Sequence, residues 1–131
     1  MLLLAMMIKE YIYGACTKNV NNSESNNMAL TKDFKLTVMM RARKDKKFRQ
    51  ALLAEAINEL LSGDIDIGKA ILRDYINATI TFEILSKAME KNPKSLMRML
   101  SPIGNPTVKS LFMILHVIQK LQKVHYRITI T

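Results

Sequence analysis

The chain of 131 residues has little of what many small proteins use to fix turns and metal sites: four glycines, three prolines, one cysteine and no tryptophan. A single cysteine, Cys16, excludes an intramolecular disulfide and a cysteine-based zinc site. So few glycines and prolines do not supply the many tight turns of a β-sandwich or barrel. The longest apolar run, residues 1–8, is far shorter than the roughly 20 residues of a membrane-spanning helix. These absences favour a small, mostly helical protein.

Acidic residues are also scarce, since 11 aspartates and glutamates stand against 20 lysines and arginines, a net charge of +9. This excess points to a polyanionic partner or to an acidic protein surface, and it says nothing about the fold. Apolar residues make up 49% of the chain and charged residues 24%, which is typical of one globular domain and too apolar for a disordered chain.

Residues 1–27 differ from the rest of the chain. Their second part, residues 20–27, reads VNNSESNN, which is polar, rich in asparagine and without periodicity. The segment has two basic and two acidic residues, so the whole positive excess lies after it. We interpret residues 1–27 as a disordered or non-native extension, with Met28 as a second possible start. The alternative is an export or lipid-anchor signal around residues 14–16, although Tyr13 stands where a leucine is usual.

The sequence after Met28 predicts two helices that meet at Asp45. Thr31 is a suitable N-cap for the first, which we expect to end near Arg43. Asp45 starts the second, where apolar residues recur every fourth position and form a broad core-facing stripe. The members of this stripe are Phe48, Leu52, Leu53, Ala56, Ile57, Leu60 and Leu61.

Gly63 is expected to end this second helix, because helices often end at a residue with positive φ. Asp64 or Asp66 then caps a third helix. Capping is a better explanation of these two acids than calcium binding, since the other ligands of a calcium loop are missing. The inward-facing residues of the third helix are predicted to be Ala70, Ile71, Tyr75 and Ile76.

Six basic residues crowd into positions 41–49 between the first two helices. One interpretation is a solvated and mobile helix junction, and the other is an auxiliary contact to phosphates or to an acidic partner. Nothing local separates the two interpretations. The residues are Arg41, Arg43, Lys44, Lys46, Lys47 and Arg49.

The segment 81–123 predicts two short helices followed by a long one. Thr81 is expected to cap a helix over residues 82–89, and Glu90-Lys91 forms a turn. Asn92 then caps a second helix whose first residue is Pro93, where the missing N–H costs nothing. The inward-facing residues of these two helices are Phe82, Leu85, Met89, Leu96 and Leu100.

Asn105-Pro106 repeats this start signal and is predicted to open the long final helix. Two short helices, a tight turn and a third helix are the outline of a helix-turn-helix. We therefore expect an all-α fold, a small helical bundle in which a phage-repressor-like helix-turn-helix precedes a short C-terminal strand. The inward-facing residues of the final helix are Leu111, Ile114, Leu115, Ile118 and Leu121.

The second short helix has the residues that a DNA-reading helix needs. The major groove admits one helix, which must expose polar side chains near its N-terminus and bury its opposite face. Arginine at position 98 can bond guanine, Ser95 can bond a base edge or phosphate, and Lys94 can neutralise phosphate. Asn92 and the free N–H groups at the helix start can hold a phosphate. Residues 82–123 have seven basic and two acidic residues, a net charge of +5.

Three segments carry a family resemblance: GKAILRDYINAT at 68–79, PKSLMRML at 93–100 and GNPT at 104–107. Over about residues 29–124 the chain resembles the addiction-module antidote proteins, which are Xre-type regulators related to antitoxins. The resemblance implies a helical DNA-binding antitoxin that represses its own operon and is paired with a small toxin similar to the RelE/ParE group. Beyond the resemblance, we expect a cytoplasmic homodimer with no cofactor and no membrane association.

By this resemblance the reading-helix positions fall on Lys94, Ser95 and Arg98, with Asn105 and Thr107 near the DNA backbone. The chain departs from the family at residues 89–92, where the turn commonly has a small residue or glycine. Including the flanking polar residues, the expected DNA contacts are Lys91, Asn92, Lys94, Ser95, Arg98, Asn105, Thr107 and Lys109.

Other candidate residues are better explained by structure than by chemistry. Arg73 and Asp74, within 68–79, are expected to form surface or interhelical ion pairs, with a toxin or dimer contact as the alternative. His116 and His125 have no neighbouring acid pattern, so neither is expected to be a general base. We find no catalytic constellation and no metal site, and therefore do not expect an enzyme.

The chain ends in YRITIT, residues 126–131, whose alternation predicts a short strand. A lone strand needs a partner: its copy in a dimer, a toxin sheet, or none if it is frayed. We thus expect one helical domain over 28–131, with leading helices (28–80), a helix-turn-helix region (81–123) and a strand or tail (124–131). The predicted function is a DNA-binding antitoxin-like repressor. The alternative is an interaction module that binds a toxin without sequence-specific DNA binding, and a membrane-anchored form ranks third.

Overall fold

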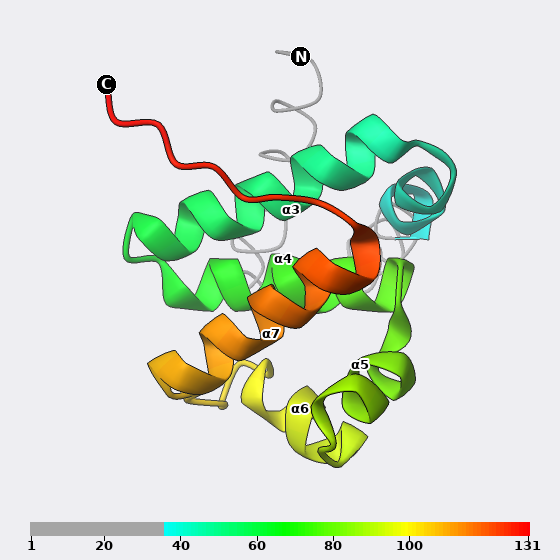
Figure 1. The fold of residues 1–131 in the computed structure, drawn as a ribbon, viewed down its shortest axis with the longest axis vertical. Coiled ribbons are helices and arrows are strands. Elements are labelled where there is room, and N and C mark those ends of the chain that lie inside the picture. Colours follow the sequence, from blue (N-terminus) through cyan, green and yellow to red (C-terminus); the bar gives the residue numbers. More distant parts are fainter. Residues whose placement is uncertain (1–35) are drawn as a thin grey trace, which may run out of the picture. The chain divides into compact units, whose positions relative to one another are not determined.

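The computed structural model describes residues 36–131, and throughout this part of the chain the regular structure is helical (Figure 1). The all-α prediction is confirmed. The expectations for residues 1–27 and for the Thr31 cap lie outside the described residues. The chain divides into two compact units, one ending at Thr79 and the other running from Ile80 to Thr131.

In the first unit, residues 36–44 are helical and are followed directly by α3 (Lys46–Leu61). Asp45 separates the two helices, as predicted, because its extended backbone interrupts the helix. Its carboxylate accepts hydrogen bonds from the backbone N–H groups of Lys47 and Phe48, at 3.0 and 3.3 Å. These bonds satisfy two of the donors that every helix start leaves without a partner.

Gly63 ends α3 with a φ of +94°, as predicted. The N–H of Asp64 then bonds back to the Glu59 carbonyl at 3.0 Å, which closes the helix end. Of the two acids proposed as the next cap, Asp64 is the one that caps α4 (Ile65–Ala78), and Asp66 lies in its first turn. The Asp64 carboxylate accepts from the Ile67 N–H at 3.4 Å.

Helices α3 and α4 lie side by side and form the core of the first unit (Figure 1). Gly68 lies at the contact between them, because a Cβ there would meet the Leu60 side chain at 2.6 Å. Two predicted core residues are exposed instead: Leu61, which lies in the last turn of α3, and Ala70. The buried side of α4 includes Lys69 rather than Ala70, alongside Ile71, Leu72, Tyr75 and Ile76.

The second unit consists of α5 (Thr81–Met89), α6 (Pro93–Met99) and α7 (Val108–Gln122). Helix α5 contacts both of the others, so the three share one small core (Figure 1). Met89 is half-buried and Leu121 is 39% exposed, so these two predicted core residues lie at its edge. The other predicted core residues are all buried: Phe82, Leu85, Leu96, Leu100, Leu111, Ile114, Leu115 and Ile118.

Two predicted helix starts in this unit are wrong. Thr81 does not cap α5, since it is already the first helical residue, Ile80 precedes it, and no side chain caps this end. Thr81 has a φ of +65°, an uncommon conformation for a β-branched residue. Asn105-Pro106 lies in the loop before α7, and Thr107 is the cap, because its hydroxyl accepts from the Ser110 N–H at 3.1 Å.

The alternating segment 126–131 forms no strand. The physical reason is that a strand needs a neighbour for its backbone groups, and residues 36–131 contain no other strand. Only the start of this tail is held, because the Tyr126 hydroxyl donates to the Leu115 carbonyl of α7 at 2.8 Å. Ile128 and Ile130 are 71% and 93% exposed.

Tyr75 gives the first unit a testable pH dependence. Burial raises the pKa of its phenol above the ordinary 10.0, partly opposed by the Arg49 charge and a hydrogen bond with Thr79. Above pH 10 the unfolded chain therefore ionises this group before the folded chain does, so its contribution to stability is lost as pH rises through the folded pKa. We expect Tyr75→Phe to flatten this alkaline loss in urea unfolding curves, and equal losses in both proteins would contradict it.

Candidate nucleic-acid interface

The connection between α5 and α6 is a tight turn centred on Glu90. Glu90 has a φ of +54°, in the left-handed region. The Lys91 N–H reaches back to the Ser86 carbonyl at 3.0 Å, and this bond closes the end of α5. Glycine is the residue that adopts this conformation at least cost. Glu90 thus lies in the part of the turn for which the family resemblance leads us to expect a small residue or glycine.

Helix α6 begins sharply, as predicted from Asn92-Pro93. The Asn92 carboxamide oxygen accepts from the Lys94 N–H at 2.8 Å, and Pro93 is the first helical residue. This oxygen is therefore occupied by the helix cap. The NH₂ group of Asn92 is the part of the side chain that is left to donate a hydrogen bond to another partner. Asn92 itself is exposed.

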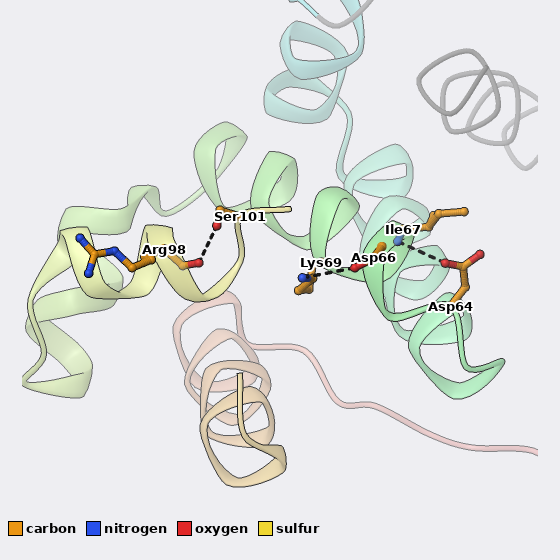
Figure 2. Close-up of polar contacts among 6 residues, drawn as sticks. All are labelled: Asp64, Asp66, Ile67, Lys69, Arg98 and Ser101. Atoms are coloured by element: carbon orange, nitrogen blue, oxygen red, sulfur yellow. Dashed lines mark hydrogen bonds and ion pairs between the residues drawn. The ribbon is translucent and has the colours of Figure 1, made fainter. Parts of the chain in front are cut away.

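The outer face of α6 carries the three predicted reading residues. Lys94, Ser95 and Arg98 are all exposed, while Leu96 is fully buried on the opposite side. Lys94 and Arg98 are four residues apart, so two like charges share one face of a helix that contains no acid. Figure 2 shows the Arg98 side chain extending from α6, with its backbone carbonyl accepting from the Ser101 hydroxyl at 2.7 Å.

Met97 is a further exposed residue of α6, at 39% of its surface. The sequence suggested that Met97 and Met99 fill the core or form adaptable contact surface. The structure divides them, because Met99 is half-buried whereas Met97 lies beside the charged residues. An exposed thioether in this position adds an apolar contact to a mainly cationic face.

The loop after α6 is packed tightly against the C-terminal end of that helix. Gly104 donates its N–H to the Ser101 carbonyl at 2.9 Å. A Cβ at Gly104 would collide with the backbone carbonyl groups of Arg98 and Met99, so only glycine fits. The motif at 104–107 therefore sets the path from α6 to α7, a role that sequence reasoning did not assign.

The predicted residues beyond this loop are exposed as well. Asn105 lies in the loop, and Lys109 lies in the first turn of α7. The Thr107 hydroxyl is occupied, since it accepts from the Ser110 N–H and donates to the Ser110 Oγ at 2.9 Å. All eight predicted contact residues are thus exposed parts of the second unit, and those of α6 share a single face.

The segment 68–79, for which a partner contact was the alternative, is mostly buried. Lys69 is only 3% exposed and its ammonium lies 3.4 Å from the Asp66 carboxylate (Figure 2). Asp74 is 7% exposed, which excludes the surface alternative predicted for it and leaves the interhelical one. Burial of one face of α4 against the core is the reason. These observations favour the structural interpretation of this segment.

Two of the six basic residues at 41–49 have structural roles that sequence reasoning missed. The Arg49 guanidinium donates to the carbonyls of Ala42 and Arg43, at 3.0 and 3.2 Å, and so closes the end of the first helix. The Arg41 guanidinium lies 5.0 Å from the centre of the Phe48 ring, a cation–π contact. The sequence held one signal for these roles: Arg41 and Phe48, like Ala42 and Arg49, are seven residues apart on opposite sides of Asp45.

Both histidines lie on the surface. His116 is exposed, and a ring nitrogen of exposed His125 lies 3.4 Å from the Gln119 amide nitrogen. Among residues 36–131, no three His, Cys, Asp or Glu side chains come together in a way that would hold a metal ion. No helix in the same range is long and apolar enough to cross a membrane.

No protein-family model matches the chain, and no curated protein or solved structure gives a significant match. The resemblance to antidote proteins therefore rests on the residues quoted above, at 68–79, 93–100 and 104–107.

The tight packing of Gly104 predicts a large effect of adding one methyl group. Gly104→Ala should destabilise the protein by about 3 kcal/mol, the upper end of the usual cost of overpacking, because a backbone carbonyl cannot move aside as a flexible side chain can. Gly63→Ala is the matched control, since it has positive φ but open space, and should cost only about 1 kcal/mol. If thermal unfolding showed the same loss of stability for Gly104→Ala and Gly63→Ala, α6 and the loop would not be closely packed.

A substitution at Glu90 is expected to have the opposite effect, a gain in stability. Glu90→Gly removes a side chain from a left-handed position, so the free energy of unfolding should rise by about 0.5–1 kcal/mol. Glu83→Gly, in the first turn of α5, is the control and should lower it, because glycine weakens a regular helix. Urea unfolding measures both, and a loss of stability for Glu90→Gly would contradict the turn geometry.

Proposed function

We propose that this protein is a DNA-binding, antitoxin-like transcriptional regulator, in which α5 and α6 act as a helix-turn-helix and α6 enters the major groove. The observation that carries the proposal is the division of α6 into two faces. Leu96 is buried, whereas Lys94, Ser95 and Arg98 are exposed together on a helix with no acid.

The chemistry of this face suits base and phosphate recognition. A major groove about 12 Å wide accepts a single helix, and a seven-residue helix presents about two turns to it. Arg98 suits a bidentate bond to guanine, and Ser95 suits a base edge or a phosphate. Lys94 neutralises phosphate at the start of the helix, and Met97 offers an apolar contact to a thymine methyl group.

The flanking residues are proposed to hold the DNA backbone. Lys91 precedes α6 and Lys109 follows the loop, and both are exposed cations. Asn92 and Asn105 contribute amide donors. Thr107 contributes less than the sequence suggested, since its hydroxyl already bonds Ser110. These contacts position the protein without selecting a sequence.

A regulator of this kind acts as a dimer, and the C-terminal segment offers a way to form one. Two copies of residues 126–131 could pair as antiparallel strands about Ile128, so that Arg127 faces Thr129 rather than another arginine. A dimer that reads two half-sites needs two α6 helices in major grooves about 34 Å apart. The predicted strand would exist only in this assembly.

The proposed partner is a small toxin of the RelE/ParE type, as the family resemblance implies, and neutralising it is the second part of the proposed function. One observation also favours the alternative, an interaction module that binds a toxin without reading DNA. Large apolar side chains are exposed on the second unit, including Ile103 at 91%, Val108 at 73% and Phe112 at 61%. If the affinity for duplex DNA did not change with salt concentration for any sequence tested, that result would support the alternative.

The test compares one arginine variant and one lysine variant. Their affinities for a selected operator and for a random-sequence duplex are measured by fluorescence anisotropy. Arg98→Ala should lose ~1–3 kcal/mol of discrimination at one base pair, because it removes a base contact. Lys109→Ala should weaken both duplexes alike and reduce the slope of log K against log salt by about 0.9, since it removes a phosphate contact. Equal losses for Arg98→Ala on both duplexes would remove it from the reading role.

A further inference from the structure

Four exposed cations surround the junction between the first helix and α3, in the first unit. Arg43 and Lys44 end the helix of residues 36–44, and Lys46 and Lys47 begin α3, with only Asp45 between the pairs. We call these four residues the junction cluster. It excludes Arg41 and Arg49, whose guanidinium groups are used within the fold.

The junction cluster has an excess of positive charge. Within the described residues no ion pair joins any of its four members to a carboxylate. The carboxylate of Asp45 is nearest in sequence, but it accepts the N–H groups of Lys47 and Phe48. The first turn of α3 contains no acidic residue either. The four cations and Asp45 together give the junction a net charge of +3 (4 − 1), which attracts an anionic ligand.

The position of two members disfavours a purely structural explanation. Arg43 and Lys44 lie at a helix C-terminus, where the helix dipole favours cations. Lys46 and Lys47, by contrast, lie in the first turn of α3, where the dipole disfavours them and favours acids. Their charges oppose helix stability, so a gain elsewhere, such as binding an anion, would explain their presence.

We propose that the junction cluster is a second nucleic-acid contact, which binds the phosphate backbone of a duplex regardless of sequence. Exposed lysines on flexible stems suit a line of phosphates, because point charges need no fixed geometry. This inference extends the proposed function but does not depend on base reading by α6.

The surroundings of the cluster favour nucleic acid over a membrane or a protein. A membrane-surface helix needs a broad apolar face, but Val38 and Ala42 are buried, which leaves Leu36 and Met40 exposed on the first helix. A protein interface is usually anchored by exposed aromatic residues and is poor in lysine. The aromatic ring at this junction, Phe48, is 1% exposed.

The test uses the full chain and a short random-sequence duplex, with affinity measured across a range of salt concentrations. Lys46→Gln/Lys47→Gln should lower the affinity severalfold at low salt and reduce the slope of log K against log salt by about 1.8, for two phosphate contacts. The control, Lys120→Gln/Lys123→Gln, removes the same charge from exposed positions near the end of α7. It should change the slope much less.

Thermal unfolding separates binding from folding. The Lys46→Gln/Lys47→Gln variant should melt at the same or a higher temperature, because its charges oppose the dipole of α3. If it melts lower, Lys46→Glu/Lys47→Glu replaces it, since acids at a helix start stabilise the helix. A variant that folds as well as the parent and binds the duplex less well supports the proposal.

Two outcomes would overturn it. Equal loss of affinity and slope in the cluster and control variants would mean that net charge alone matters. Unchanged duplex binding, together with weaker binding to vesicles of anionic lipid, would assign the cluster to membranes. The proposed function has a separate test, since it fails if the full chain binds no duplex sequence more tightly than random DNA. That result would not affect the salt test of the junction cluster.

Discussion

The structure of the second unit depends on how α6, a helix of only seven residues, is held in place. A helix this short is not stable alone in water, since the cost of starting it exceeds what a few hydrogen bonds return. It persists because Asn92 and Pro93 define its first turn, Leu96 and Leu100 are buried, and Gly104 lets the following loop close against its end. Because these contacts all lie on its inner side or at its ends, the outer face is free for Lys94, Ser95 and Arg98.

The positive charge of the chain is divided between folding and binding. Arg41, Arg49 and the buried Lys69 each have a partner within the fold, so their charges do not indicate a polyanionic ligand. The exposed cations fall mainly on α6 with its flanking turns and on the junction cluster. The net charge of +9 indicated a polyanionic or acidic partner but not where it binds. Only the structure separates the cations that stabilise helices from those that remain available.

Helix caps were only partly predictable from the sequence, and contacts between more widely spaced residues were not predicted. Asp45 and Asn92 were predictable as caps because each bonds N–H groups two or three residues away. Thr81 and Asn105-Pro106 match the same patterns, yet neither starts a helix as a cap. Gly104 and Arg49 act on backbone carbonyls six and seven residues away, which is beyond the reach of the cap patterns, so a capping motif does not reveal them. Of the candidate site, the exposed face of α6 was predictable from its apolar spacing, whereas its base-reading role is proposed.

The most direct test of α6 as a reading helix is cleavage of bound DNA from a reagent attached to that helix. An iron chelate on Ser95→Cys, with Cys16→Ser to remove the native thiol, generates radicals that cut nearby sugars. If α6 lies in the major groove, cuts should cluster at two places one helical turn apart within the protected sequence. A protein that still protects the same sequence but produces no cuts from this position would show that another surface contacts DNA.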